Sequence, residues 1–284
     1  MENKNHFLIL NKVFMSKRLR NKDKGLVFTN AVINNQADII RELIQDIDPS
    51  FNNDQWIRLA SEKGCVDVVR ELIKDPRVNP SSDNNYAICW ASWKGYIEVV
   101  RELLKDPRVD PSAVENRAIQ DASAYGHIEV VRELLKDPRV DPSDGHNAAI
   151  RFSSRNGHTD VVCELLKDPR VDPSIGNRNF PLCSASEYGH VEIVRVLLKD
   201  HRVDPSVHSN YALRVASSKG YKEIVCELLK DPRVDPSDND NDAIRLASAN
   251  KHVQIIHDLL KDSRVCNSLS LECLLIVARQ QNKK

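Results

Sequence analysis

The chain has 284 residues, of which 41% are apolar and 5% aromatic, and its 41 Lys and Arg balance its 41 Asp and Glu. This neutral balance argues against nucleic acid as a partner, because such affinity comes largely from Lys and Arg that neutralise phosphates. The 7 cysteines are odd in number and form no C-x-x-C, which indicates free thiols in a reducing compartment rather than disulfides or a zinc site. No stretch approaches the roughly 18 apolar residues of a membrane span. We therefore expect a soluble, cytoplasmic protein with no membrane partner.

The first residues are the least regular part of the chain. Residues 6–15 are apolar in patches, and the basic cluster 17–20 follows them instead of preceding them, which is a poor match to a signal peptide. Three interpretations of residues 1–24 stay open: a capping helix, an ordered arm that binds a partner, and a disordered tail.

The rest of the chain is organised by one repeated phrase. Residues 97–112 read I-E-V-V-R-E-L-L-K-D-P-R-V-D-P-S, and residues 128–143 repeat the same letters. The first Leu of this phrase has counterparts at Leu43, Leu72, Leu103, Leu134, Leu165, Leu197, Leu228 and Leu259. A nearly constant period of 31 residues predicts eight stacked structural units, since self-similarity of this kind is typical of solenoids.

Each unit predicts two short helices and a loop. In the unit that begins at Asn85, residues 85–94 form the first helix, Gly95 ends it, and residues 97–105 form the second helix, with Val99, Val100, Leu103 and Leu104 as its apolar stripe. Asp106-Pro107 stops the second helix, and the polar loop 106–112, here called the finger, leads to the next unit. The position of Asn85 is filled by Asp or Asn in seven units, which predicts N-caps of the first helices at Asp54, Asn85, Asn116, Asn147, Asn179, Asn210 and Asn241.

The terminal units differ from the others, as the ends of a stack must. The glycine position holds Asn35 in unit one and Lys251 in unit eight. Beyond unit eight, residues 271–282 match the first-helix pattern and predict a ninth first helix that covers the end. The expected organisation is a cap or arm at 1–24, eight repeats at 25–268, and a half-repeat cap at 269–284.

The pattern resembles the ankyrin repeat. Residues 122–135 read A-S-x-x-G-H-x-E-V-V-x-x-L-L, which is similar to the A-A-x-x-G-H-x-E-V-V-x-x-L-L core of that family, and the resemblance covers residues 25 to 282. The T-P-L-H opening of the family is replaced, for example by R-A-I-Q at 117–120, and its Gly-Ala after the second helix becomes Asp-Pro-Arg-Val. The fingers are therefore either β-hairpins or tight loops. The phrase K-D-P-R-V-D-P-S is similar to ankyrin arrays of large DNA viruses of amoebae and of amoebae themselves.

The resemblance implies an all-α solenoid with a non-catalytic function. In ankyrin repeats the exposed end of the first helix and the finger tips face a concave groove where protein partners bind. Aromatic residues and Arg dominate binding hot spots. The implied partner-binding residues are Trp90, Trp93, Lys94, Tyr125, Arg155, Asn156, Tyr188 and Lys219. The competing interpretation for Trp90, and for Phe152 in the same position of another unit, is packing between repeats.

Two recurring residue types, His and Arg, suggest metal binding and phosphate binding, which we weigh against structural roles. His127, His158, His190 and His252 recur in the turn, but units about 10 Å apart cannot share metal ligands that bind at about 2 Å. Arginines recur along the fingers, at Arg77, Arg108, Arg139, Arg170, Arg202, Arg233 and Arg264, and suggest a phosphate-binding track. Because acids stand two residues before them and mostly two residues after them, mutual pairing is the favoured interpretation.

The sequence therefore predicts a monomeric scaffold that binds a protein partner, without cofactor, metal or nucleic acid. The alternative is an adaptor that links the bound target to a second protein through residues 1–24, for example for modification or degradation. An enzyme is disfavoured because no P-loop, G-x-G-x-x-G or H-E-x-x-H occurs. The identity of the partner is not encoded in any motif.

Overall fold

The computed structural model describes residues 21–174 and 180–269, and within these ranges it contains 17 α-helices and no β-strand. The helices are α2 (Asn21–Ile33), α3 (Ala37–Leu43), α4 (Phe51–Lys63), α5 (Val66–Ile73), α6 (Ser82–Lys94), α7 (Ile97–Leu104), α8 (Ala113–Ala124), α9 (Ile128–Leu134), α10 (Asp144–Asn156), α11 (Thr159–Leu165), α12 (Phe180–Tyr188), α13 (Val191–Leu198), α14 (Val207–Lys219), α15 (Lys222–Leu228), α16 (Asp238–Ala249), α17 (Val253–Leu259) and α18 (Ser263–Ser268). The predicted all-α class is confirmed.

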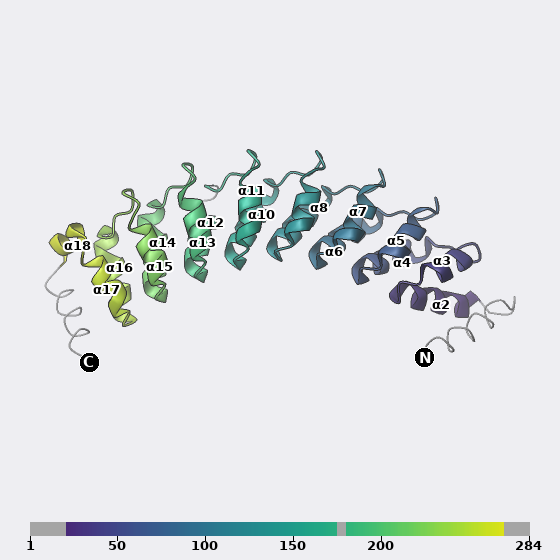
Figure 1. The fold of residues 1–284 in the computed structure, drawn as a ribbon, viewed down its shortest axis with the longest axis horizontal. Helices are drawn as coiled ribbons and strands as arrows, with labels where there is room; N and C mark the ends of the chain where they lie inside the picture. Colours follow the sequence, from purple (N-terminus) through teal and green to yellow (C-terminus); the bar gives the residue numbers. More distant parts are fainter. Residues whose placement is uncertain (1–20, 175–179, 270–284) are drawn as a thin grey trace. The chain divides into compact units, whose positions relative to one another are not determined.

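The chain divides into two compact units, residues 1–114 and 115–284. In the first unit, the first helices α2, α4 and α6 pack side by side, and the second helices α3, α5 and α7 form a parallel row (Figure 1). In the second unit, α10, α12, α14 and α16 form the row of first helices, and α9, α11, α13, α15 and α17 form the row of second helices. Within each unit, helices of the same row that follow one another in the chain pack against each other, as the repeat period predicts.

The core of the stack consists of small residues on the first helices and aliphatic residues on the second. In α7, Val99, Val100 and Leu103 are fully buried, whereas Leu104 is only half-buried, so the predicted apolar stripe is one residue narrower than expected. In α6, Ala91 and Ser92 are fully buried. Side chains this small allow the first helices to approach one another closely.

The turn between the two helices requires glycine for two reasons. Gly126 has a φ of +76°, in the left-handed region that residues with a Cβ rarely adopt. A Cβ on Gly126 would also lie 2.5 Å from the Nδ1 atom of His158 in the next unit. The predicted helix-ending glycines are confirmed. The substitutes Asn35 and Lys251 have φ values of 53° and 63°, so the exceptional units keep the same backbone conformation.

The predicted N-caps are wrong, and the structure gives these residues a different role. Asn85 has a φ of +58° and is the third of three left-handed residues within the first turn of α6. Its Oδ1 atom accepts a hydrogen bond of 2.8 Å from the backbone N–H of Asp110, in the finger 25 residues later. We call residues in this position the clamp residues. The same bond is made by Asp54, Asn116, Asn147 and Asn210, whereas Asn241 contacts Ser268 and Asn179 lies outside the described residues.

The first helices open with a left-handed turn at the end of the finger: α6 begins at Ser82, but Asp83, Asn84 and Asn85 have φ values of 55°, 56° and 58°, so its right-handed part begins at Tyr86, next to the predicted start. Ser81 and Ser143 are the N-cap residues of α6 and α10. The Asp of the D-P-S sequence organises this start: the Oδ1 atom of Asp110 accepts hydrogen bonds from the N–H of Ser112 at 2.9 Å and from its hydroxyl at 2.6 Å. These bonds order the backbone within the finger, and the N-cap serines make no side-chain capping hydrogen bond of their own. The clamp residue instead binds the finger that follows it in the same repeat.

Ion pairs join the second helices of neighbouring repeats. The Nη2 atom of Arg70 lies 2.9 Å from Glu102 of the next repeat, and Lys105 contacts the same carboxylate at 2.9 Å. Arg41 and Lys74 hold Glu71 in the same way and lower the pKa of Glu71 to about 2. Ion pairs within one helix, such as Glu98–Arg101 at 2.7 Å, are present as well. The bridges between repeats were not expected from the sequence.

The ends of the array are described in part. Residues 21–24 of the predicted arm belong to α2, while residues 1–20 and the predicted ninth first helix at 271–282 lie outside the described residues. The short helix α18, in place of a finger after α17, was not predicted.

Candidate functional site

The predicted partner-binding residues all lie at or next to the last turns of first helices, but in two separate units. Trp90, Trp93 and Lys94 are on α6 in the first unit. The others belong to the second unit: Tyr125 directly follows α8, Arg155 and Asn156 end α10, Tyr188 ends α12, and Lys219 ends α14. The two groups are therefore described separately.

In the first unit, three aromatic residues form a stripe along α6. Tyr86, Trp90 and Trp93 follow one another at spacings of four and three residues, so they lie on one helix face. The rings of Tyr86 and Trp90 are stacked with centroids 5.1 Å apart, and Trp90 meets Trp93 edge-on at 4.6 Å. All three side chains are half-buried. Trp90 thus packs within its own helix face and still presents part of its surface to solvent.

Cations lie at both ends of this aromatic stripe. The Nζ atom of Lys94 is 3.8 Å from the centroid of the Trp93 ring, and the guanidinium of Arg58 is 5.3 Å from that of Tyr86. Arg58 also forms an ion pair with Asp83 at 3.0 Å. Lys94 is exposed and contacts a ring that is partly accessible, an arrangement in which a cation and an aromatic face can both contact a ligand.

In the second unit, the structure brings Arg155 and Tyr188 together. The guanidinium of Arg155 lies 5.2 Å from the centroid of the Tyr188 ring. One turn earlier, Arg151 lies 4.5 Å from the ring of Phe180 in the same way. Tyr188 is 44% exposed and Phe152, between the two arginines, is 37% exposed. Phe152 is therefore more accessible than a purely packing role requires.

The remaining predicted residues differ in their roles. Tyr125 is 54% exposed and its ring lies 6.5 Å from that of His127. Asn156 is exposed, but its Nδ2 atom donates a hydrogen bond of 2.7 Å to the carbonyl of Ala124 in the preceding repeat, which is a structural use of its amide. Lys219 is exposed at the end of α14.

Sequence reasoning missed Tyr86 and Arg151 as members of these surfaces. Tyr86 could have been found from its helical spacing to Trp90. Arg151 could not, because its contact with Phe180 depends on how α12 is placed after the one 32-residue step of the array.

The turn histidines are structural, as predicted. The Nε2 atom of His158 lies 3.0 Å from the carbonyl oxygen of Ala124, and His190 and His252 make equivalent contacts with Arg155 and Ser218. Each imidazole is thus held against the glycine turn of the preceding repeat. Among the described residues no group of three His, Cys, Asp or Glu side chains is placed to hold a metal ion.

The finger arginines are paired rather than free for phosphate, which confirms the favoured interpretation. Arg108 lies 2.6 Å from Asp106, and its Nη1 atom donates a hydrogen bond of 2.7 Å to the carbonyl of Val78 in the preceding finger. The hydrogen bonds from Arg108 hold the pKa of Asp106 below its ordinary value. The same Asp–Arg pair recurs at Asp75–Arg77, Asp137–Arg139, Asp168–Arg170, Asp200–Arg202, Asp231–Arg233 and Asp262–Arg264. In most fingers the Arg also donates a hydrogen bond to a backbone carbonyl of the preceding repeat, so these arginines connect repeats.

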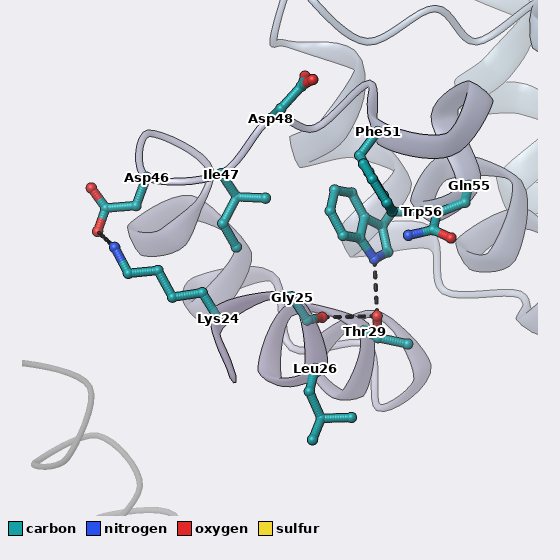
Figure 2. Close-up of a pocket in the computed structure, with 10 residues that line it drawn as sticks. All are labelled: Lys24, Gly25, Leu26, Thr29, Asp46, Ile47, Asp48, Phe51, Gln55 and Trp56. Atoms are coloured by element: carbon teal, nitrogen blue, oxygen red, sulfur yellow. Dashed lines mark hydrogen bonds and ion pairs between the residues drawn. The ribbon is translucent and has the colours of Figure 1, made fainter. Parts of the chain in front are cut away.

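A separate pocket lies in the first unit beside the start of α2 (Figure 2). It has a volume of about 540 Å³ and lies between α2, the loop of residues 46–48 that follows α3, and α4. The Nε1 atom of Trp56 donates a hydrogen bond of 3.0 Å to the Thr29 hydroxyl at its floor. Leu26 and Phe51, which also line it, are 64% and 58% exposed. The pocket is thus a mainly apolar surface that adjoins the predicted arm.

The described helices include none with the length and apolar character needed to cross a bilayer. None of the curated proteins compared with the chain matches it. A family model described as ankyrin repeats in three copies matches residues 28–115, 116–209 and 148–240. These matches cover most of the chain, and they agree with the stacked helix pairs, the glycine turns and the buried small residues described above. The chain belongs to the ankyrin repeat family.

Proposed function

We propose that the protein is a non-catalytic scaffold that binds a partner protein through the exposed ends of its first helices. The observation that carries this proposal is the pair of large aromatic side chains, Tyr125 and Tyr188, which occupy the same position of two repeats and stay 54% and 44% exposed. Ankyrin repeats generally mediate protein–protein interactions, and they typically have no enzymatic activity. Both facts support a binding function at these positions.

The energetics favour the same surface. An exposed tyrosine ring has few torsions to immobilise, so it contributes contact area to an interface at a low cost in conformational entropy. Elsewhere on the array, most charged side chains are held in ion pairs or bonded to the next repeat, as Arg108 is. The first-helix ends thus combine accessible apolar area with side chains that have few structural duties. We place the partner on the concave face to which these ends belong in ankyrin repeats, and we propose that the scaffold acts as a cytoplasmic monomer.

Site-specific photocrosslinking tests this proposal. A photoreactive phenylalanine analogue replaces Tyr125, Tyr188 or, as a control, Lys136, whose side chain is 68% exposed just after the second helix α9. Crosslinked partner protein is expected from positions 125 and 188 and not from position 136. Crosslinks from position 136 alone would place binding on the opposite face and contradict the proposal. The Tyr125→Ala/Tyr188→Ala variant should lose the partner while keeping its unfolding midpoint.

A second candidate function is the adaptor, in which the N-terminal end of the array engages another protein. The pocket beside α2 supports it, because Leu26 and Phe51 line it and leave apolar area exposed. In this case Phe51→Ser should abolish binding of the second protein and leave the crosslinks from positions 125 and 188 unchanged. Loss of both interactions in this variant, with the fold intact, would argue that a single continuous partner covers both surfaces.

A further inference from the structure

Two arginines on α10 differ from the other arginines of the first helices. Arg151 and Arg155 are one helical turn apart, and each guanidinium lies on an aromatic ring of α12, 4.5 Å from Phe180 and 5.2 Å from Tyr188. In the ranges 21–174 and 180–269, neither forms an ion pair with a carboxylate. Each of the other arginines on the described first helices has a carboxylate nearby. The ion pairs are Arg58–Asp83, Arg117–Asp121 and Arg214–Asp242, and Arg245 lies 4.0 Å from Asp242, at the longest distance of an ion pair.

The contact with a ring leaves the terminal Nη N–H groups of each guanidinium available, while the Nε atom of Arg151 is buried. An arginine on an aromatic ring contacts it through its flat face, so the N–H groups at its edge stay directed away from the ring. Rings on one side of each guanidinium also restrict its motion, so that less entropy is lost when a ligand binds. Arg151 and Arg155 are therefore held in place by packing rather than by an acid that a ligand would have to displace.

The position of Arg151 costs stability. Its Nε atom is buried and has no hydrogen-bond partner among the described residues. A buried donor without a partner destabilises the folded state. The contact of the guanidinium with the Phe180 ring offsets part of this cost. A ligand that accepts hydrogen bonds from the remaining N–H groups would offset more of it.

Exposed apolar side chains lie beside the two cations. Phe152 follows Arg151 directly and is 37% exposed, and Tyr188 beside Arg155 is 44% exposed. The surface formed by Arg151, Phe152, Arg155, Phe180 and Tyr188, here called the Arg151–Arg155 patch, thus presents two cations one turn of α10 apart, with aromatic rings next to them.

We propose that the Arg151–Arg155 patch binds an acidic segment of the partner protein, in which two carboxylates one helical turn apart flank an apolar side chain. Residues four apart on a helix have Cβ atoms about 5–6 Å apart, so a second helix presents carboxylates at the same spacing as the two arginines. Each carboxylate can accept two parallel hydrogen bonds from one guanidinium edge. This inference rests on the proposed scaffold function and specifies the chemistry of its partner.

The neighbouring repeat argues against a longer polyanion such as RNA or DNA. In the next repeat the position of Arg155 is taken by Glu187, and the arginine after it in this row, Arg214, is engaged by Asp242 at 2.8 Å. The positive surface therefore ends after two arginines. A chain of regularly spaced phosphates would meet Glu187 at the next step, whereas a short acidic peptide segment would not.

Selection from a displayed library of random 12-residue peptides tests the proposal. Peptides are selected on the full-length protein and counter-selected on Arg151→Gln/Arg155→Gln. The enriched sequences should carry two Asp or Glu residues three or four positions apart with an apolar residue between them. Replacing either acid by its amide should weaken binding at least about ten-fold, as expected for a lost charge-assisted hydrogen bond. Binding should also weaken as salt is raised.

Matched variants locate the site. Arg151→Gln and Arg155→Gln should each weaken the selected peptides about ten-fold, while Arg245→Gln, which removes an arginine from the same position of α16 as Arg151, should change binding less than about two-fold. Arg151→Gln should also leave the urea midpoint unchanged or raised, because it removes a buried donor without a partner. A variant that instead unfolds more readily would assign the arginine a structural role and overturn the inference.

The remaining outcomes separate this inference from the scaffold function. Peptides that bind the double arginine variant equally well, and lose affinity in Tyr125→Ala/Tyr188→Ala, would keep the scaffold and overturn the acidic partner. A phosphopeptide or single-stranded RNA that competes better than the selected dicarboxylate peptides would overturn it in favour of phosphate. A library that yields no binder also counts against the acidic segment, and the crosslinking experiment then decides the scaffold independently.

Discussion

The clamp residues offer the most direct test of how a first helix fixes the finger that follows it in the same repeat. Asn147 is 1% exposed, has a φ of +57°, and accepts a hydrogen bond of 2.9 Å from the backbone N–H of Asp172. Replacing it with alanine removes the acceptor and also places a residue with a Cβ, but without a side-chain polar group, in the left-handed region. Two separate penalties therefore fall on one position.

Their magnitudes can be worked out from the geometry. Leaving the partly buried N–H of Asp172 without a protein acceptor should cost about 1–2 kcal/mol. The left-handed conformation of alanine adds about 1–2 kcal/mol. Asn147→Ala should therefore destabilise the protein by about 2–4 kcal/mol. Asn147→Gly removes the same hydrogen bond but adopts a positive φ without steric cost, so it should be about 1 kcal/mol less damaging.

Urea unfolding and amide hydrogen exchange together measure this effect. Urea unfolding gives the change in the free energy of unfolding, provided that the slope with denaturant is unchanged. Exchange at the amide of Asp172 reports whether the lost stability is at the finger, which matters because repeat arrays can open locally. The reasoning is refuted if Asn147→Ala keeps both the wild-type midpoint and slow exchange at Asp172, or if the glycine variant is the more damaging of the two.

Three further predictions concern the stability of the array. Val114 is β-branched, 53% exposed and has a φ of +56°, so Val114→Asn should raise the free energy of unfolding by about 1 kcal/mol in urea, and a lower midpoint would contradict the strain. In α10, the hydroxyl of Ser154 is buried with no hydrogen-bond partner among the described residues, whereas the hydroxyl of Ser153 donates to a carbonyl at 2.9 Å. Ser154→Ala should therefore raise the free energy of unfolding by about 1 kcal/mol, and Ser153→Ala should not. Equal effects of the two substitutions would contradict this distinction. The pKa of Glu71 is lowered to about 2 from its ordinary value of 4.5, so its stabilisation is complete above about pH 4.5 and is lost as the pH falls toward 2. Because Arg41 is 59% exposed, Arg41→Gln should make the loss of stability between pH 4.5 and 2 only slightly smaller, and an unchanged pH profile would show that the pair contributes nothing.

The repeat period, the helix pairs and the glycine turns were predictable because they depend on local chemistry that recurs in every unit. The clamp residues were misassigned for a physical reason. Asn and Asp favour helix N-caps, and they also tolerate the left-handed region better than other residues with a side chain. A row of Asn at Asn85 and its counterparts is therefore compatible with both roles. Only the hydrogen bond to the finger 25 residues later distinguishes them.

The sequence predicts where the candidate surfaces lie, but not every residue that contributes to them. The ends of the first helices follow from the period, so Trp93, Tyr125 and Tyr188 could be named from the sequence. The contact between Arg151 and Phe180 spans 29 residues and follows the only 32-residue step in the central part of the array, where a register error of one residue would turn the ring to another face. Sequence reasoning cannot fix such a contact until the helices are placed.

The regularity of the array provides its own criterion for a binding site. A position at which most repeats use the same kind of side chain for the same bond, as the finger arginines use Asp and a neighbouring carbonyl, is explained by the stack alone. A functional residue is then one whose interactions differ from those of its counterparts in the same position. Arg151 meets this condition: Arg58 and Arg214, in the same position of other repeats, lie within 3.0 Å of an Asp, whereas Arg151 stacks on a ring and leaves a buried nitrogen unsatisfied. Since the other arginines show that a carboxylate can be provided at this position within the fold, the absence of one around Arg151 among the described residues is what makes an acid from a partner the physically consistent ligand.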